Sequence, residues 1–200
     1  VNLGRLDTKG KKPKDGVEWG VRSVLPLAEF RVLFELEQWE LDDVVRGAED
    51  ADLGALEEAA KKAALFEEKA VYQGFSEAGV KGILESAPYD KLSLSEDVVN
   101  YAEAVGTAVQ HLQLAGIDGP YALVLSADRY YKLMRTLKPG YPLYRIISNI
   151  IEGPVMWSPA VETGVLVSTR GGDYELCIGQ DLSIGYNSSD SKKVELYFTE

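Results

Sequence analysis

The sequence predicts an α+β fold in which strands come first, helices occupy the middle and strands return at the end. Apolar and polar residues alternate over residues 17–45, which is typical of strands. Apolar residues then recur every three or four positions in 53–74 and 95–116, as they do in amphipathic helices. Alternation resumes after residue 155, punctuated by glycine. Runs of strands separated by a block of helices indicate α+β, with the late strands free to return to the early sheet.

The composition excludes several classes of protein. Hydrophobic residues make up 46% and charged residues 26% of the 200 residues, which are globular values and exclude a disordered, collagen-like or disulfide-stapled chain. Lys and Arg number 21 against 32 Asp and Glu, so the formal net charge is −11. This charge repels nucleic-acid phosphates and anionic lipid headgroups, so we expect neither nucleic acid nor a membrane as a partner.

The two ends of the chain indicate where the protein resides and how much of it is given. No apolar run approaches the ~20 residues of a membrane span, and no signal-peptide pattern opens the chain, so we expect a cytoplasmic protein. The chain starts at Val1 rather than at Met and stops at Glu200 inside the strand-like KKVELYFTE. We therefore expect a fragment that lacks both natural ends.

The first element, residues 1–22, is predicted to be a long hairpin or extended arm, because glycines and proline interrupt it. Its apolar residues are too sparse to pack the arm against its own domain. Two interpretations stay open: a solvated terminus, or an arm ordered by packing on a neighbouring subunit. The basic and turn-forming residues before Trp19 are Arg5, Lys9, Lys11, Lys12 and Lys14, with Gly4, Gly10, Pro13 and Gly16.

The alternation over residues 17–45 predicts a sheet that includes Trp39. This tryptophan stands among carboxylates, so its ring is expected near the surface. An indole at the surface is either an oligomer contact or a stacking platform for a planar ligand, and the contact is the better supported of the two. The neighbouring acidic residues are Glu37, Glu40, Asp42 and Asp43.

Four helices and one buried strand are predicted next. Asp52 is a suitable N-cap for a long amphipathic helix that Gly74 ends. A second helix follows Ser95 and stops at Gly116. The remaining segments are the strand GIDGPYALVLS, the helix ADRYYKLMRTL, the turn KPGYP and the helix PLYRIISNII.

The last part of the chain predicts antiparallel sheet, because apolar and polar residues alternate in several short segments. The pairs GG and SS and the single glycines between them suit turns. Cys177 falls within one of these expected strands. The segments are VMWSPAV, GVLVSTR, DYELCIGQDLSIGY and KKVELYFTE.

The residues that usually carry catalysis have no recognisable arrangement here. The single histidine, His111, lies in the middle of a helix, and no G-x-S-x-G elbow accompanies the serines. A Glu-x-x-His metal motif is absent because Ala108 stands three residues before His111. The Gly171-Gly172 pair leads into a strand and is not a phosphate loop. The acidic residues Glu57, Glu58, Glu67 and Glu68 alternate with lysines and indicate a solvated helix face. We therefore expect no catalytic residues and no metal ligands.

Particular strings are more informative than periodicity, and from about Val17 to Glu200 they resemble the encapsulin shell proteins, also called linocin-like bacteriocins. The strings are EWGVRSVLPLAEFRVLFELEQWELDDVVRG, EEKAVYQGFSEAGVKGIL, GIDGPYALVLSADRYY, YPLYRI and GGDYELCIGQDLSIGY. The resemblance implies the tailed-phage major capsid fold. It places an extended loop at 1–22, a peripheral domain with a spine helix at 23–94, an axial domain at 95–154 and return strands at 155–200.

The resemblance also implies a function. Family members assemble into icosahedral compartments that enclose ferritin-like iron oxidases or peroxidases bearing a C-terminal targeting peptide, and the shell subunit does no chemistry. The chain is therefore expected to be a homo-oligomeric shell subunit and not an enzyme. Two alternatives stay open, a phage-type capsid protein and, less favoured, a bacteriocin or protease. The N-terminal helix in which family members contact cargo is missing from this chain, so no cargo-docking residues are named.

Two sites follow from the same resemblance. The turn between the third and fourth helices is expected to line an axial opening that admits small ions; its residues are Thr136, Leu137, Lys138, Pro139, Gly140 and Tyr141. A flavin, FMN, is expected to stack on Trp39 of a WELD motif, with Arg31 holding its phosphate or a ring carbonyl and Asp42 accepting hydrogen bonds. Val32 and Leu33 complete this expected flavin site. A subunit contact remains the alternative role of Trp39.

Overall fold

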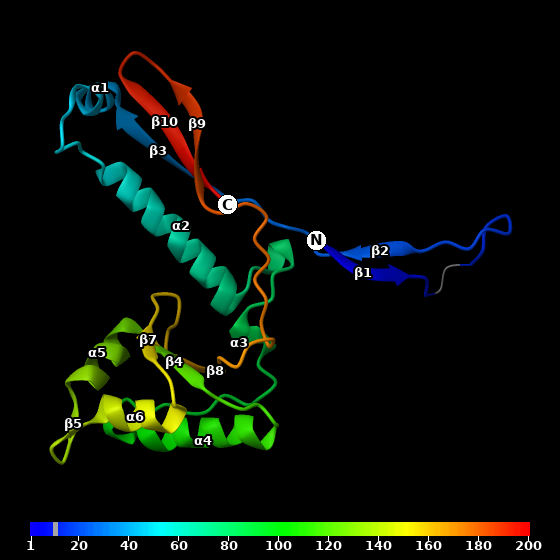
Figure 1. The fold of residues 1–200 in the computed structure, drawn as a ribbon, viewed down its shortest axis with the longest axis vertical. Helices are drawn as coiled ribbons and strands as arrows, with labels where there is room; N and C mark the ends of the chain where they lie inside the picture. The colour runs from blue at the N-terminus through cyan, green and yellow to red at the C-terminus, as the bar shows by residue number, and fades with distance from the viewer. Residues whose placement is uncertain (10–11) are drawn as a thin grey trace. The chain divides into compact units, whose positions relative to one another are not determined.

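The computed structural model describes residues 1–9 and 12–200. The chain divides into two units (Figure 1). Unit 1 comprises residues 1–63, 77–79 and 176–200, and unit 2 comprises residues 64–76 and 80–175. Helices and strands are mixed in both units, which confirms the α+β prediction.

The N-terminal arm is a two-stranded antiparallel hairpin. Strand β1 (Asn2–Asp7) pairs with β2 (Val21–Val24), so that Leu6 lies opposite Arg22. The hairpin prediction is confirmed for the residues described; Gly10 and Lys11, which the expected arm includes, lie outside them. Gly20 packs so close to β1 that a Cβ at this position would meet the Leu6 side chain at 2.7 Å.

Unit 1 contains a three-stranded antiparallel sheet with the order β3-β10-β9. The strands are β3 (Arg31–Glu37), β9 (Ser183–Ser189) and β10 (Lys193–Thr199). Phe34 of β3 and Phe198 of β10 pack their rings 5.2 Å apart in the core. The last strand of the chain therefore pairs with an early one, as the fold class predicted.

A helix, α1 (Gln38–Arg46), follows β3 directly, so the prediction of a strand continuing to residue 45 is wrong. Glu37 keeps an extended backbone, and the next residue already begins the helix. Arg46 in the last turn and Gly47 at φ 103° are helix-ending signals that the alternation obscured. Trp39 is consequently a helical residue.

The long helix α2 (Gly54–Gln73) agrees closely with its predicted range. The Asp52 carboxylate accepts a hydrogen bond from the Gly54 amide at 3.0 Å, which confirms its role at the helix start. Residues 54–63 of the helix belong to unit 1 and residues 64–73 to unit 2. Two short helical turns follow, η1 (Ser76–Ala78) and α3 (Ile83–Ser86).

Unit 2 contains a second three-stranded sheet with the order β7-β4-β8. Its strands are β4 (Tyr121–Leu125), β7 (Val155–Trp157) and β8 (Gly164–Ser168). All five residues of β4 are buried. Strand β7 runs parallel to β4, so the expectation of purely antiparallel late strands is wrong for this strand, which returns to the sheet after two intervening helices.

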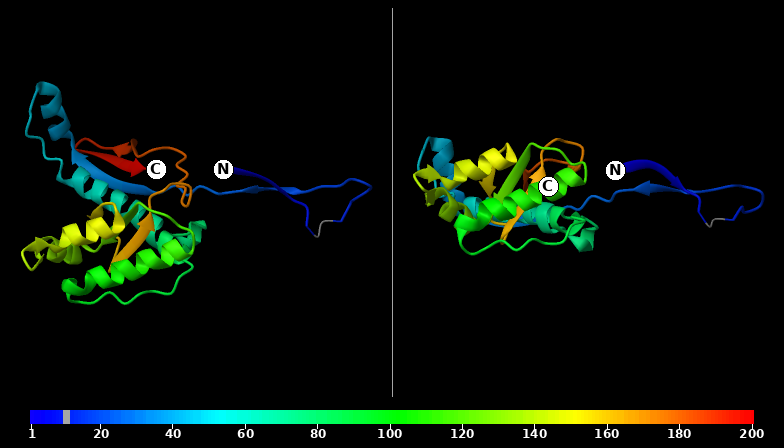
Figure 2. Two further views of the ribbon diagram at one scale, coloured as in Figure 1. Left: turned by 60° about the horizontal axis from the view of Figure 1, so that its bottom comes forward. Right: turned by 90° about the horizontal axis from the view of Figure 1, so that it is seen from below.

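The helices of unit 2 pack with this sheet around one core (Figure 2). The 3-10 turn η2 (Val98–Asn100) leads into α4 (Tyr101–Leu114). Helix α6 (Leu143–Ile151) packs against α4 and fully buries three aliphatic side chains, Leu143, Ile147 and Ile151. Helix α5 (Ala127–Arg135) precedes α6 and is joined to it by a small hairpin, β5 (Leu137–Lys138) and β6 (Tyr141–Pro142).

The segment from Thr169 to Leu182 contains no strand, so the expected strand around Cys177 begins only at Ser183. Gly171 and Gly172 both have positive φ, and Arg170 forms an ion pair with Asp173 across them, so the turn expected at this glycine pair is confirmed although no strand follows it directly. The strands of the expected return segment 155–200 belong to different units. Strands β7 and β8 are part of unit 2, and β9 and β10 are part of unit 1.

Candidate functional site

The Trp39 ring is one of the most exposed aromatic groups of unit 1, with 70% of the residue accessible. It lies in the first turn of α1, directly after the end of β3. The guanidinium carbon of Arg46 is 6.0 Å from the ring centroid, at the outer range of a cation–π contact. Arg46 also pairs with Asp43 on the same helix. Trp39 thus presents an open ring beside one partly neutralised cation.

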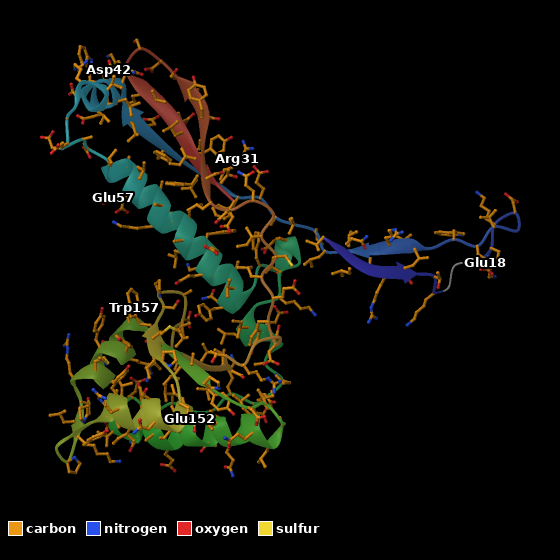
Figure 3. The ribbon with its side chains drawn as sticks, in the orientation of Figure 1. Glu18, Arg31, Asp42, Glu57, Glu152 and Trp157 are labelled. Atoms are coloured by element: carbon orange, nitrogen blue, oxygen red, sulfur yellow. The ribbon has the colours of Figure 1, made fainter. Side chains whose placement is uncertain are left out.

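Arg31, by contrast, lies at the far end of β3. Its guanidinium donates a 2.8 Å hydrogen bond to Glu29 and covers the Tyr197 ring at 4.6 Å. The Glu29 hydrogen bond, with a further contribution from Tyr197, raises the pKa of Arg31. The strand from Arg31 to Glu37 spans about 20 Å at the usual rise per residue, so Arg31 and Trp39 do not meet within one subunit. Figure 3 labels Arg31 and, at the other end of the strand on α1, Asp42.

The other three residues of the expected flavin site are divided in the same way. Val32 packs on the core of unit 1, and Leu33, on the opposite face of β3, is 57% exposed. Asp42 lies on α1 and accepts a hydrogen bond from the Gln38 amide nitrogen at 3.2 Å. The structure therefore brings Asp42 and Trp39 together on α1 and leaves Arg31, Val32 and Leu33 on the strand. Sequence reasoning missed Arg46, whose position seven residues after Trp39 places both on one helix face.

The expected pore turn is a single compact hairpin at the junction of α5 and α6. Leu137 pairs with Pro142 and Lys138 with Tyr141, and Gly140 adopts φ 76° at the bend. Thr136 connects the hairpin to both helices. Its hydroxyl donates to the Lys132 carbonyl of α5 at 2.8 Å, and its own carbonyl accepts from the Leu143 amide of α6 at 3.0 Å. The structure therefore brings all six residues of the expected turn together.

The tip of this hairpin is open to solvent. Leu137 is 66% exposed and Tyr141 46% exposed, and the residues between them are exposed as well. Covering Leu137 with another surface would remove its apolar area from water, at about 25 cal/mol for each Å².

An apolar flank lies on the same unit beside the hairpin. It comprises Tyr131 and Met134 of α5 with Trp157 of β7, all between 42% and 47% exposed. The Tyr131 and Trp157 rings are 6.5 Å apart (Trp157 is labelled in Figure 3). Exposed aromatic and methionine side chains gathered on one face are typical of protein contacts.

The arm displays a third apolar surface. Leu3, Leu6, Val21 and Val24 of β1 and β2 are each more than half exposed. The Trp19 indole donates to the Lys12 carbonyl at 3.1 Å and is itself 49% exposed.

The residues considered for chemistry lie apart from these surfaces. His111 is exposed near the end of α4, at the rim of a 570 Å³ cavity of unit 2 lined mainly by aliphatic side chains. Cys177 is half-buried in the irregular segment of unit 1. Within residues 1–9 and 12–200, no group of three or more His, Cys, Asp and Glu side chains is placed to hold a metal ion. No helix in this described part is both long and apolar enough to cross a membrane.

Comparison with known proteins gives the context for these surfaces. The model of the family Linocin_M18, described as an encapsulating protein for peroxidase, matches residues 1–200. The chain is 42% identical over 186 residues to the type 1 encapsulin shell protein of Rhodococcus erythropolis, which covers 93% of this chain and 70% of the relative. It is 40% identical over 200 residues to the type 1 encapsulin shell protein of Mycobacterium tuberculosis, covering 100% of this chain and 75% of the relative.

A solved structure shares the fold. The virus-like particle from Pyrococcus furiosus aligns with a TM-score of 0.69 at 20% sequence identity, covering 94% of this chain and 76% of that chain. The expected capsid fold is confirmed by this likeness.

Proposed function

Because the chain belongs to the Linocin_M18 family of encapsulating proteins and is a subunit of a self-assembling shell, we propose that its copies enclose a cargo enzyme and admit small ions through openings between them. The subunit forms the wall of the compartment and catalyses no reaction. The cargo is an enzyme such as a peroxidase or a ferritin-like iron oxidase, carried in by a targeting peptide. A chain with a single cysteine suits the reducing cytoplasm, where we place the compartment.

The arm is the observation that carries the assembly. A two-stranded hairpin is marginally stable by itself in water, yet β1 and β2 expose Leu3, Leu6, Val21 and Val24. These side chains gain stability when a second subunit covers them, at about 25 cal/mol for each Å² of apolar surface removed from water. The interpretation of the arm as a contact with a neighbouring subunit is therefore favoured over a solvated terminus.

The apolar flank supports a ring of neighbouring copies. Contacts made head to tail around a closed axis join two different faces of each subunit. With Tyr131, Met134 and Trp157 against the next copy, the hairpin Thr136–Tyr141 of the same unit is proposed to face the axis. The proposed opening is lined by this hairpin, in which Pro139 and Gly140 at the bend leave part of the lining to backbone groups.

A flavin on Trp39 is the second proposal, and the exposed ring favours it. An isoalloxazine ring is flat and partly apolar, so it fits the 70% exposed indole, with Asp42 and Arg46 as polar neighbours on α1. Arg31 of the same subunit is too distant to join this site. The carboxylates of Glu37, Glu40 and Asp43 around α1 disfavour the phosphate of FMN, so we expect the ring rather than the phosphate to provide most of the affinity.

Negative-stain electron microscopy of the full-length protein tests the assembly. We expect hollow particles of uniform diameter that elute near the void volume of a size-exclusion column. A monodisperse monomer at micromolar concentration would refute the proposal. Mass spectrometry of proteins that copurify with the particles then identifies the cargo.

A further inference from the structure

The residues around the proposed opening have an unusual charge. Residues 129–151 contain five basic side chains and no carboxylate, although the chain as a whole has a net charge of −11. This stretch runs from α5 through the β5-β6 hairpin to the end of α6. The five basic residues are Arg129, Lys132, Arg135, Lys138 and Arg145.

Two of these cations are neutralised by carboxylates outside the stretch. Arg129 pairs with Glu96 at 2.6 Å, and its side chain is only 13% exposed. Lys132 pairs with Asp128 at 2.7 Å, and the hydrogen bond from this partner raises the pKa of the lysine. Both cations belong to α5.

The remaining three, Arg135, Lys138 and Arg145, form what we call the cationic collar. All three are exposed, and no ion pair joins them to any residue in the described part of the chain. Their backbone positions surround the hairpin. Arg135 ends α5 just before Thr136, Lys138 is in β5, and Arg145 is in the first turn of α6.

The backbone holds these three positions in a fixed arrangement. The bond from the Leu143 amide to the Thr136 carbonyl joins the end of α5 to the start of α6, and the Lys138–Tyr141 pair closes the hairpin between them. A symmetric ring repeats such a fixed arrangement once for each copy. Charges at the mouth of a narrow, low-dielectric opening then act on every ion that passes.

We propose that the cationic collar makes the opening selective for small anions over small multivalent cations. The inference rests on the proposed function, which places the hairpin at the opening. Rings of Arg and Lys side chains are the usual lining of anion and phosphate pores. The acidic remainder of the shell attracts cations, so the collar reverses the sign of the field where ions cross. Oxyanions such as inorganic phosphate are the class of solute that it favours.

The experiment compares two octahedral complexes with charges of equal size and opposite sign, hexacyanoferrate(III) and hexaamminecobalt(III). Shells of the full-length protein in a Cys177→Ala background are reassembled around a fluorescein-labelled dextran, and quenching by each complex is followed by stopped flow. Quenching of the free dye calibrates both. We expect the anion to cross at least about tenfold faster than the cation at low salt, and this ratio to fall as added salt screens the charges.

Charge-reversal variants test the collar itself. Arg135→Glu, Lys138→Glu and Arg145→Glu should each lower the anion-to-cation ratio, and the triple variant should invert it. Lys81→Glu is the matched control, because Lys81 is an exposed lysine of unit 2 outside the collar, and it should leave the ratio unchanged. Equal ratios in wild type and all three single variants, in intact particles, would overturn the proposal. The single variants decide the question even where the triple variant does not assemble.

A blocking experiment separates this inference from the proposed function. Pro139→Cys in the same background is labelled with a bulky maleimide at the hairpin tip. If labelling slows both complexes and charge reversal changes nothing, the hairpin lines the opening but the collar does not select ions. If labelling slows neither, the hairpin does not line the route, and the opening and the selectivity are both refuted.

Discussion

Arg129 donates a hydrogen bond of 2.8 Å to the hydroxyl group of Tyr101, a residue with no exposed surface. The same guanidinium donates to the Ser95 carbonyl at 2.9 Å, so it joins α5 to the segment before α4. The hydrogen bond with Tyr101 is the main reason that the pKa of Arg129 is raised.

Replacing Arg129 by methionine should destabilise unit 2 by about 2–3 kcal/mol, because the buried Tyr101 hydroxyl and the partly buried Ser95 carbonyl lose a charged donor. Tyr101→Phe removes only the hydroxyl and should cost about 1 kcal/mol. Urea unfolding followed by tryptophan fluorescence measures both. An equal loss in the two variants would show that the arginine acts only through Tyr101.

Deleting residues 6–15 should prevent or loosen shell closure while leaving the helices folded, because the deletion removes the end of β1 and the turn of the arm. Circular dichroism should keep its helical signal, and microscopy should show open or irregular assemblies. A Gly/Ser segment of the same length in place of these residues is the control for spacing and should fail in the same way. Normal particles from both variants would show that the arm is dispensable.

Purified shells incubated with FMN should be yellow, and Trp39→Ala should remove the flavin absorbance. Because Arg46 and not Arg31 lies beside the ring, Arg46→Ala should weaken flavin binding more than Arg31→Ala does. Absorbance per particle, with particle integrity checked by microscopy, measures the effect. Colourless wild-type shells in excess FMN would refute the site, and an effect of Arg31→Ala alone would indicate that the arginine reaches the flavin from a neighbouring subunit.

His111→Gln and Cys177→Ala should each leave the activity of an enclosed cargo enzyme unchanged. The first residue lies at the rim of the apolar cavity of unit 2, and the second in the irregular segment of unit 1. Steady-state assays of loaded shells test this expectation. Activity in empty wild-type shells that either substitution abolishes would instead show that the subunit is an enzyme.

The Arg170–Asp173 pair should contribute stability that depends on pH. Arg170 donates hydrogen bonds of 2.9 and 2.8 Å to Asp173, and they lower the pKa of this carboxyl below its ordinary 3.8. The contribution is therefore complete above the pKa of the unfolded chain and is lost as the pH falls through the lower pKa of the folded state. The difference in urea midpoint between wild type and Asp173→Asn should be constant down to about pH 5 and shrink towards about pH 2. A constant difference throughout would contradict the linkage.

The long helices and the buried strand were predictable because one signal dominates each of them. Helix α2 has a capping aspartate, a continuous apolar face and a terminal glycine, and β4 is a short apolar run between a turn and a serine. Helix α1 was missed because strand alternation leads straight into it, with no proline, glycine or side-chain cap at the junction of Glu37 and Gln38. The turn at Gly171-Gly172 was predicted, but the strand expected directly after it was wrong, because apolar and polar residues alternate there without forming a strand before Ser183.

The candidate sites also differ in how well local sequence predicts them. The hairpin Thr136–Tyr141 is local in sequence, so its residues were bound to lie together. The flavin residues were chosen as one strand-like string, and the strand itself separates them by its length. Arg46 could be associated with Trp39 only once the intervening residues were known to be helical, and the pairing of Arg129 with Tyr101 and Glu96 depends on tertiary contacts that no local pattern records.

The pairing of β3 with β10 also sets the order in which a newly made chain can fold. Lys193 of β10 donates to Glu35 of β3, which precedes it by 158 residues, whereas Leu125 of β4 pairs with Gly164 of β8 only 39 residues later. At the usual rate of synthesis, β3 waits about 8–30 s on the ribosome for its partner strand. Unit 2 can thus complete its core while unit 1 cannot, and a subunit able to join a shell exists only after β10 has been translated.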